Sequence, residues 1–390
     1  MNGGRRKIRW IRTKTKEFLS QNAHFETIKA DRLYRLLGVR LEGKGPFIRT
    51  EKLGSQISAK RLQPVDAGDF MYSRLFAWRG ALGLIPTQMD HCYVSNEFPS
   101  YRIDQNKILP KFLEMYFQQK DVWKKIESFC TGTTKTSRNR FKEKAFLDFE
   151  IPLPSIQEQE GIVAQMEYYR TRIGQVRKTI ASQQLEISQL LLSTYHNIVR
   201  DAIFQPMSEV APIIRRPVHV VPSDEYHELG IRSFGEGTFH KPAISGSSLG
   251  EKRIFWIRPG DILFNNVFAW EGAVAVAKQE DDNRVGSHRF ITCLPKEGAA
   301  TARFLCFYFL TQEGLDQLKK ASPGGAGRNR TLGLRKLEKI LVPTPKFEKQ
   351  VWFDELLKKA EEVIFLKRKI DAELPLLLSS IVHYIIEDNS

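Results

Sequence analysis

The sequence predicts an α+β protein: two similar mixed α/β modules, joined by two long helices that form an antiparallel coiled coil with pseudo-twofold symmetry. Three observations predict this architecture. Most of the 390-residue chain is one unit written twice, each copy ends in a long stretch of helical character, and each copy is long enough to bury its own hydrophobic core.

The duplication is clearest where GDFMYSRLFAWRGA, beginning at Gly68, returns as GDILFNNVFAWEGA, beginning at Gly260. These glycines are 192 positions apart, and the same offset relates Trp78 to Trp270. A period of this length is too long for a solenoid, whose repeats run about 20 to 50 residues. It indicates two duplicated domains.

Within each copy, the pattern predicts short strands in the middle and a helix near the end. Residues 70–75 and 262–267 follow a Gly-Asp turn and are rich in strand-forming residues. Apolar residues at helical spacing predict one helix over 111–129 and another over 301–320. Each module is therefore expected to mix strands and helices.

A long stretch follows each module, and both stretches carry apolar residues at steps of three, four or seven. They predict long helices from 156 to about 203 and from about 347 to 386, the second bent at Pro375. A helix of about 45 residues is roughly 70 Å long and would act as a spacer. We expect the two helices to pair antiparallel; the alternative is that each packs on its own module.

The predicted boundaries follow from these patterns. The first module occupies 1–154 and includes a basic leader at 1–15, which we expect to be a disordered tail. The first long helix occupies 155–204, the second module 205–345 and the second long helix 346–390.

A formal net charge of +15 and 11% aromatic residues suit binding to a polyanion, although a generally basic protein would look similar. Apolar runs are far shorter than a bilayer requires, and the amino terminus lacks the apolar core of a secretory signal. The four cysteines form no CxxC pair, which favours reduced thiols. We expect a cytoplasmic protein.

The motifs of common enzymes are missing from the sequence. No GxGxxG follows a strand, and neither a Walker loop, an HExxH motif nor paired metal-ligand spacings occur. The eight histidines are scattered and none is duplicated. We therefore expect binding rather than bond making, with no catalytic residue and no metal site.

Both copies combine a GD-strand-AWxGA element, a late basic loop, an IPLP or VPTP segment, and a helix that begins near EQ or KQ. This combination resembles the specificity subunit of type I restriction-modification enzymes, and IPLPSIQEQEGIVAQM from Ile151 is particularly characteristic. The resemblance implies that each module is a target recognition domain for one half of a bipartite double-stranded DNA site. It also implies that the helices recruit modification (methyltransferase) subunits.

In that family, catalysis belongs to partners. The resemblance implies that S-adenosylmethionine, ATP and Mg²⁺ are bound by modification and restriction/translocase subunits, and that this chain holds no cofactor. Two alternatives remain open at the level of sequence: a stand-alone DNA methyltransferase or nuclease with unrecognised motifs, and a helical protein-binding scaffold whose charge is incidental.

Comparing the two copies predicts the DNA-binding residues. Aligned positions that differ could read unlike bases. Arg74 aligns with Asn266, and Arg79 aligns with Glu271, although each could be a solvated surface side chain. Positions charged in both copies suit a uniform phosphate backbone, with ordinary surface charge as the alternative. They are Arg40 and Arg232; Lys60, Arg61, Lys252 and Arg253; and Arg138, Arg140, Arg328 and Arg330.

Overall fold

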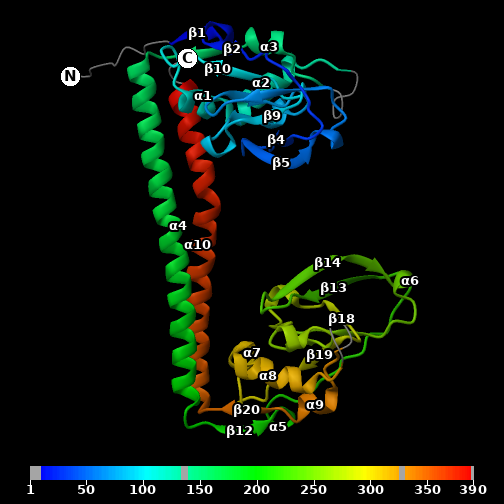
Figure 1. The fold of residues 1–390 in the computed structure, drawn as a ribbon. Helices are drawn as coiled ribbons and strands as arrows, with labels where there is room; N and C mark the ends of the chain where they lie inside the picture. Colours follow the sequence, from blue (N-terminus) through cyan, green and yellow to red (C-terminus); the bar gives the residue numbers. More distant parts are fainter. Residues whose placement is uncertain (1–9, 133–138, 325–329, 388–390) are drawn as a thin grey trace, which may run out of the picture. The chain divides into compact units, whose positions relative to one another are not determined.

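The computed structural model describes residues 10–132, 139–324 and 330–387 (Figure 1). The chain divides into two compact units: unit 1 contains Met1–Thr179 with Lys369–Ser390, and unit 2 contains Ile180–Arg368. Each unit holds one module and one end of each long helix, α4 (Ile156–Val199) and α10 (Phe347–Glu387). The first module precedes α4, and the second module lies between α4 and α10.

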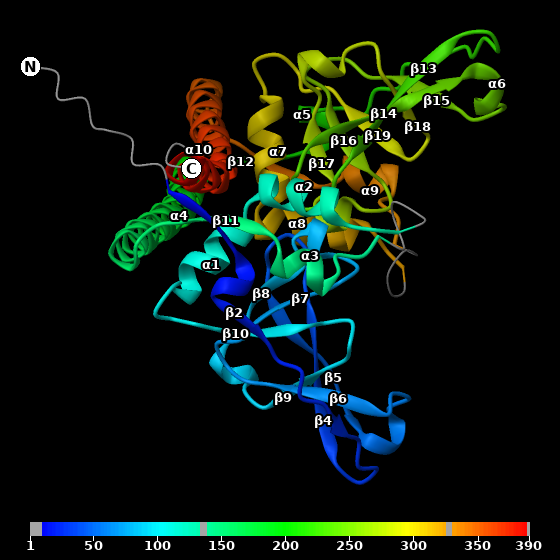
Figure 2. The same cartoon turned by 90° about the horizontal axis from the view of Figure 1, so that it is seen from above.

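The first module contains three sheets, with strand orders β3-β6-β9-β4-β5, β2-β10-β7-β8 and β1-β11. In Figure 2, β4, β5, β6 and β9 lie at one end of this module, and its helices lie toward the other. The strands are β1 Ile11–Lys14, β2 Leu19–Gln21, β3 Glu26–Thr27, β4 Leu33–Val39, β5 Pro46–Leu53, β6 Arg61–Val65, β7 Phe70–Tyr72, β8 Leu82–Leu84, β9 Cys92–Val94, β10 Ser100–Ile103 and β11 Glu150–Leu153. The helices are α1 Pro110–Phe117, α2 Lys120–Phe129 and α3 Glu143–Leu147.

The second module repeats this plan with sheets β14-β13-β18-β15, β17-β16-β19 and β12-β20. A parallel pair, β4 with β9 or β13 with β18, lies inside the larger sheet of each module. The strands are β12 Ile203–Pro206, β13 Glu225–Ile231, β14 Thr238–Ser245, β15 Ile254–Trp256, β16 Ile262–Asn265, β17 Val274–Val276, β18 Val285–Ser287, β19 Phe290–Cys293 and β20 Leu341–Thr344. The helices are α5 Met207–Val210, α6 Gly246–Leu249, α7 Ala302–Leu310, α8 Gln312–Ala321 and α9 Leu334–Glu338.

The duplication extends to the backbone torsion angles. Four non-glycine residues among those described have a positive φ, a conformation that costs energy for L-amino acids. They form two pairs at the offset of 192: Glu42 and Phe234 at +60° and +61°, and His91 and Asn283 at +55° and +58°. The two modules therefore share loop geometry even where the side chains differ.

The basic leader differs from the prediction. Ile11–Lys14 form strand β1, which pairs antiparallel with β11 in the register of Ile11 opposite Leu153. Thr15 is fully buried, and its N–H donates to the carbonyl of Phe149 at 3.0 Å. The expectation of a disordered tail is wrong for residues 11–15, while residues 1–9 lie outside the described part of the chain. β1 corresponds to β12 of the second module at the same offset, so the repeat begins earlier than the sequence indicated.

The helix predicted late in each module is two helices. In the first module the break lies at Gln118 and Gln119, between α1 and α2. In the second it lies at Thr311, whose hydroxyl accepts a hydrogen bond from the N–H of Gly314 and so caps α8. Helical spacing of apolar residues continues across both breaks, which is why the sequence indicated one helix.

The long helices run antiparallel within each unit. In unit 1 the early residue Met166 of α4 shares a buried cluster with the late residue Val382 of α10, and Figure 1 shows these helix ends side by side. Farther along, Arg177 and Asp371 form an ion pair at 2.8 Å. In unit 2 the late residue Tyr195 of α4 lies against Phe353 of α10, with ring centroids 6.1 Å apart. Numbers rise on α4 as they fall on α10, which is the predicted antiparallel order.

Each helix end also enters the core of its module, so helix pairing and module packing occur together. The unit 1 cluster surrounds the aromatic ring of Phe146, with Tyr72 and Tyr101 at centroid distances of 4.8 Å. Helix α10 continues through Pro375. No helix in the described residues is long and apolar enough to span a membrane.

Candidate nucleic-acid interface

Arg74 lies where three segments of the first module meet. Its backbone N–H donates to the carbonyl of Glu97, in the turn before β10, at 3.0 Å. Its own carbonyl accepts from the N–H of Phe141, just after the basic loop, at 2.8 Å. These bonds join the end of β7, the β9–β10 turn and the loop exit into one junction.

Side chains at this junction form two ion pairs. Arg74 pairs with Glu143 at the start of α3, and both side chains are largely covered, at 22% and 24% exposed. Arg140 pairs with Glu97, with Nη1 and Oε1 3.0 Å apart. Two arginines are thus matched by two glutamates, and the predicted base-reading residue Arg74 already has an internal partner.

The second module has the same junction in its backbone. The N–H of Asn266 donates to the carbonyl of Arg289 at 2.8 Å, and the carbonyl of Asn266 accepts from the N–H of Leu332 at 2.7 Å. Asn266 aligns with Arg74, and Arg289 aligns with Glu97, both at 192. The frame is retained while the side chains change.

Those changes remove both acids. Arg289 replaces Glu97, and Leu334, the first residue of α9, replaces Glu143, the first residue of α3. The side-chain oxygen of Asn266 is buried and has no hydrogen-bond partner among the described residues. The guanidinium of Arg330 lies 5.1 Å from the ring centre of Trp270. The second junction therefore carries positive charge where the first is balanced.

The duplicated AWxGA segments form a tight turn beside each junction. Trp78 and Trp270 donate through Nε1 to the carbonyls of Leu75 and Val267, at 2.9 and 3.0 Å. Because each indole donates a hydrogen bond within its own turn, a packing role fits these tryptophans better than a base-stacking role. Arg79 is exposed, 5.9 Å from the Trp78 ring, whereas Glu271 accepts a hydrogen bond from Ser233 Oγ at 3.4 Å.

Arg40 and Arg232 occupy equivalent places at the β4–β5 and β13–β14 turns. Both are exposed, and each guanidinium stacks on an aromatic ring, Phe47 at 4.6 Å and Phe239 at 4.8 Å. Stacking reduces the freedom of a long side chain. Arg232 also donates through Nη1 to the carbonyl of Thr238 at 3.1 Å. Their shared geometry suits a contact made in both modules.

The remaining duplicated charges lie on other loops. Lys60 and Arg61 are exposed at the start of β6, with Arg61 5.8 Å from the Phe25 ring. Lys252 and Arg253 are exposed before β15 and line a surface hollow together with His288. Arg138 and Arg328 lie outside the described residues.

Sequence comparison missed the partners of the predicted residues. Glu143 lies 69 positions from Arg74, and no local pattern links them. Arg289 could have been found, because the same alignment that paired Arg74 with Asn266 sets Glu97 against Arg289. Opposite charges at one aligned position are a strong signal of unlike surfaces.

Comparison with known proteins agrees with this geometry. Residues 26–182 match the model of the type I restriction modification DNA specificity domain. The match covers most of the first module and runs into α4. No curated protein matches the chain significantly.

Solved structures extend the likeness in fold beyond the matched segment. The HsdS subunit from Thermoanaerobacter tengcongensis aligns with a TM-score of 0.60 and 18% identity over 100% of both chains. A chain from a study of complex assembly and conformational transition of the type I R-M system aligns with a TM-score of 0.68 and 18% identity over 98% of both. At this identity the likeness concerns the fold, and it confirms the predicted arrangement of two modules and long paired helices.

The matched segment includes more than half of α4, and a buried glutamine attaches the start of this helix to the first module. Gln159 Oε1 accepts from the N–H of Leu109 at 2.7 Å, and its Nε2 donates to the carbonyls of Lys107 and Pro154 at 3.1 and 2.9 Å. Gln159 is fully buried. This explains the glutamine of the EQ element, whose role the sequence did not indicate.

Gln350 repeats this clamp in the second module. Its Oε1 accepts from the N–H of Thr301 at 3.1 Å, and its Nε2 donates to the carbonyls of Ala299 and Pro345 at 3.1 and 2.9 Å. Three hydrogen bonds satisfy each buried amide, which would otherwise be costly to bury. Each module is therefore fixed to the start of the helix that follows it.

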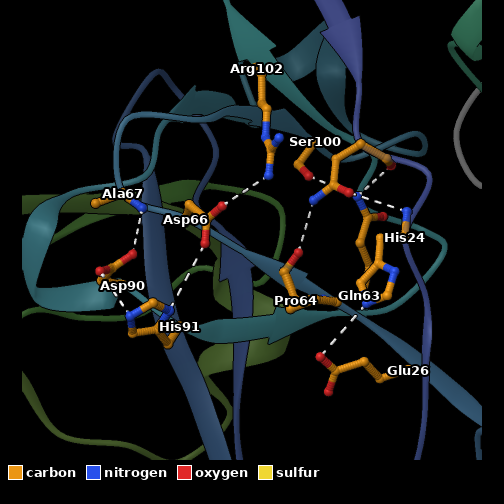
Figure 3. Close-up of polar contacts among 11 residues, drawn as sticks. His24, Glu26, Gln63, Pro64, Asp66, Ala67, Asp90, His91, Ser100 and Arg102 are labelled. Carbon is orange, nitrogen blue, oxygen red and sulfur yellow. Dashed lines mark hydrogen bonds and ion pairs between the residues drawn. The ribbon is translucent and has the colours of Figure 1, made fainter.

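Asp66, Asp90 and His91 in the first module could offer metal ligands, with their atoms within 4.8 Å of one another (Figure 3). Both carboxylates already have partners, because Arg102 pairs with Asp66 at 3.4 Å and a backbone N–H donates to Asp90 at 2.8 Å. We interpret these contacts as stabilising a turn of the first module.

The cysteines are poor nucleophiles. All four are free, and burial raises the pKa of Cys306 and of Cys293 to about 12 and that of Cys130 to about 11. A thiol attacks as the thiolate, so these groups stay protonated and unreactive near neutral pH.

Proposed function

We propose that this chain is the noncatalytic, sequence-specific DNA-binding subunit of a type I restriction-modification complex. In this proposal each module reads one half of a bipartite site in double-stranded DNA. The observation that carries it is the pair of junctions, which share one backbone frame but differ in their polar side chains. A shared frame holds two readers in the same way, and unlike side chains let them prefer unlike bases.

The long helices supply a surface for partner subunits. Within unit 2, exposed apolar side chains on the paired helices include Leu185, Leu190 and Phe365, the last 67% exposed. Apolar side chains gathered on a helix surface favour protein contact. We propose that modification (methyltransferase) subunits dock here, that restriction/translocase subunits join them, and that these partners hold S-adenosylmethionine, ATP and Mg²⁺.

Methylation mapping tests this function. The chain is expressed with its modification subunits in a host, and methylated positions are determined by sequencing. We expect one asymmetric motif with two specified parts and a fixed unspecified spacer. The purified chain without partners should transfer no methyl group from labelled S-adenosylmethionine to the same DNA. Methyl transfer by the chain alone, or a single undivided motif, would contradict the proposal.

A further inference from the structure

We propose that Arg289 contacts DNA in the second half-site, through an interaction for which the first module has no counterpart. This inference rests on the proposed DNA-binding function and adds a specificity-determining residue to it. Arg289 precedes β19, and its carbonyl receives the N–H of Asn266 in the second junction.

The first step is the equivalence of the two positions. Glu97 and Arg289 are 192 residues apart. The carbonyl of Glu97 accepts a hydrogen bond from the N–H of Arg74, and the carbonyl of Arg289 accepts one from the N–H of Asn266. Because equivalent hydrogen bonds fix the two backbones, the two side chains start from equivalent positions in their modules. Their difference in charge is therefore a difference in what the two surfaces present.

The second step is the state of the side chains. Glu97 is used internally, since it pairs with Arg140 at 3.0 Å. Arg289 is exposed, and within the described residues its guanidinium makes no hydrogen bond, ion pair or ring contact. An arginine that stabilises nothing in its own module is available for a ligand that accepts hydrogen bonds.

The third step is the surroundings. The neighbouring residue His288 lines a hollow with Glu251, Lys252 and Arg253, so two cations and one carboxylate lie there. Beside Arg289, the oxygen of Asn266 is buried and has no partner among the described residues. The exposed cations match the edge of a nucleic-acid duplex, which offers phosphate oxygens and guanine acceptors.

Charge reversal tests the contact. Arg289→Glu restores the charge that the first module carries at this position, and Lys296→Glu is the matched control. Lys296 is exposed just past the far end of β19, so both variants change the net charge equally and flank the same strand. Each is assembled with the modification subunits, and binding is measured with a short duplex that carries the mapped motif.

We expect Arg289→Glu to weaken binding roughly tenfold or more relative to Lys296→Glu. Scrambling the second half of the duplex should abolish that difference, whereas scrambling the first half should preserve it. Equal binding by the two variants would overturn the inference. If the wild-type complex does not prefer the motif to scrambled DNA, the proposed function itself fails, which is a separate outcome.

Arg289→Gln serves as a second variant, because it keeps an exposed polar side chain and does not place a new charge beside the junction. It also separates two kinds of DNA contact. Loss of preference at one base pair identifies a base contact, whereas a uniform loss with the salt slope reduced by about one identifies a phosphate contact. Unchanged affinity for this variant would also contradict the inference.

Discussion

Arg74 and Glu143 form an ion pair inside the first module, and neither charge is kept at the matching places of the second module, which hold Asn266 and Leu334. The surrounding backbone hydrogen bonds are the same in both modules. Duplication therefore preserved the frame of the junction and changed its polar groups. This is the physical basis for expecting unlike half-sites.

Separate substitutions of Arg74 and Asn266 should alter different halves of the recognised site. Arg74→Ala removes the Arg74 guanidinium from the first junction, and Asn266→Ala removes the side-chain amide from the second. We expect each to relax one position in one half, by about 1–3 kcal/mol of discrimination. Methylation mapping of both variants measures this, and changes in the same half would show that the module assignment is wrong.

Gly80→Ala should destabilise the protein more than Gly272→Ala. Both glycines have φ near +77°, a conformation that costs an L-residue about 1–2 kcal/mol. A Cβ on Gly80 would lie 2.5 Å from the Trp123 ring, whereas a Cβ on Gly272 would meet Leu310 at an ordinary 3.4 Å. We expect an extra loss of about 1–3 kcal/mol for Gly80→Ala. Chemical denaturation measures the free energy of unfolding of both variants. Equal losses of stability would contradict the packing argument.

Gln159→Leu should loosen the joint between the first module and α4. The change removes the hydrogen-bond partner of one N–H and two carbonyls of the module. Each buried polar group without a partner costs about 1–3 kcal/mol. We expect a loss of about 3 kcal/mol or more in the free energy of unfolding. Gln165→Leu, an exposed position on the same helix, is the control. Similar melting temperatures for the two variants would argue against a clamp.

Asp354 should make stability depend on pH. Burial raises its pKa to about 6, above the ordinary 3.8, and a hydrogen bond with Thr301 only partly opposes this. The folded protein then binds the proton more tightly than the unfolded chain, so this group's contribution to stability is lost as pH rises from about 4 to about 6. Asp354→Asn should melt a few degrees above wild type near pH 8, and the two curves should converge near pH 4.

The matched control for this titration is Asp201→Asn, which changes an exposed carboxylate in the same unit. It should leave the difference between high and low pH unchanged. A pH profile of Asp354→Asn parallel to that of wild type would show that the buried carboxyl does not titrate in this range.

Features with a regular period could be predicted from the sequence. The offset of 192 revealed both modules, and helical spacing revealed α4 and α10, because one unit copied twice and long helices leave patterns in the order of residues. Strand β1 was missed because it is an edge strand with exposed side chains: Ile11 is 77% exposed and resembles a tail residue. An edge strand is specified by backbone pairing, and that pairing depends on β11, far along the chain.

The composition of the junction could be predicted only in part. Repeat alignment identified Arg74 and Asn266, since unlike residues in a shared frame stand out. It could not assign Glu143 as the partner of Arg74, because that contact exists only once α3 packs against the end of β7. Side-chain pairs between distant segments are products of folding, and a single sequence does not record them.

The most direct test of the account is a chain in which the second module is replaced by a copy of the first, from β1 to β11, in place of β12 to β20. The recognised motif is then determined by methylation mapping with the modification subunits present. If each module reads one half-site, the two halves of the new motif will be the same. Retention of two unlike halves would contradict the account.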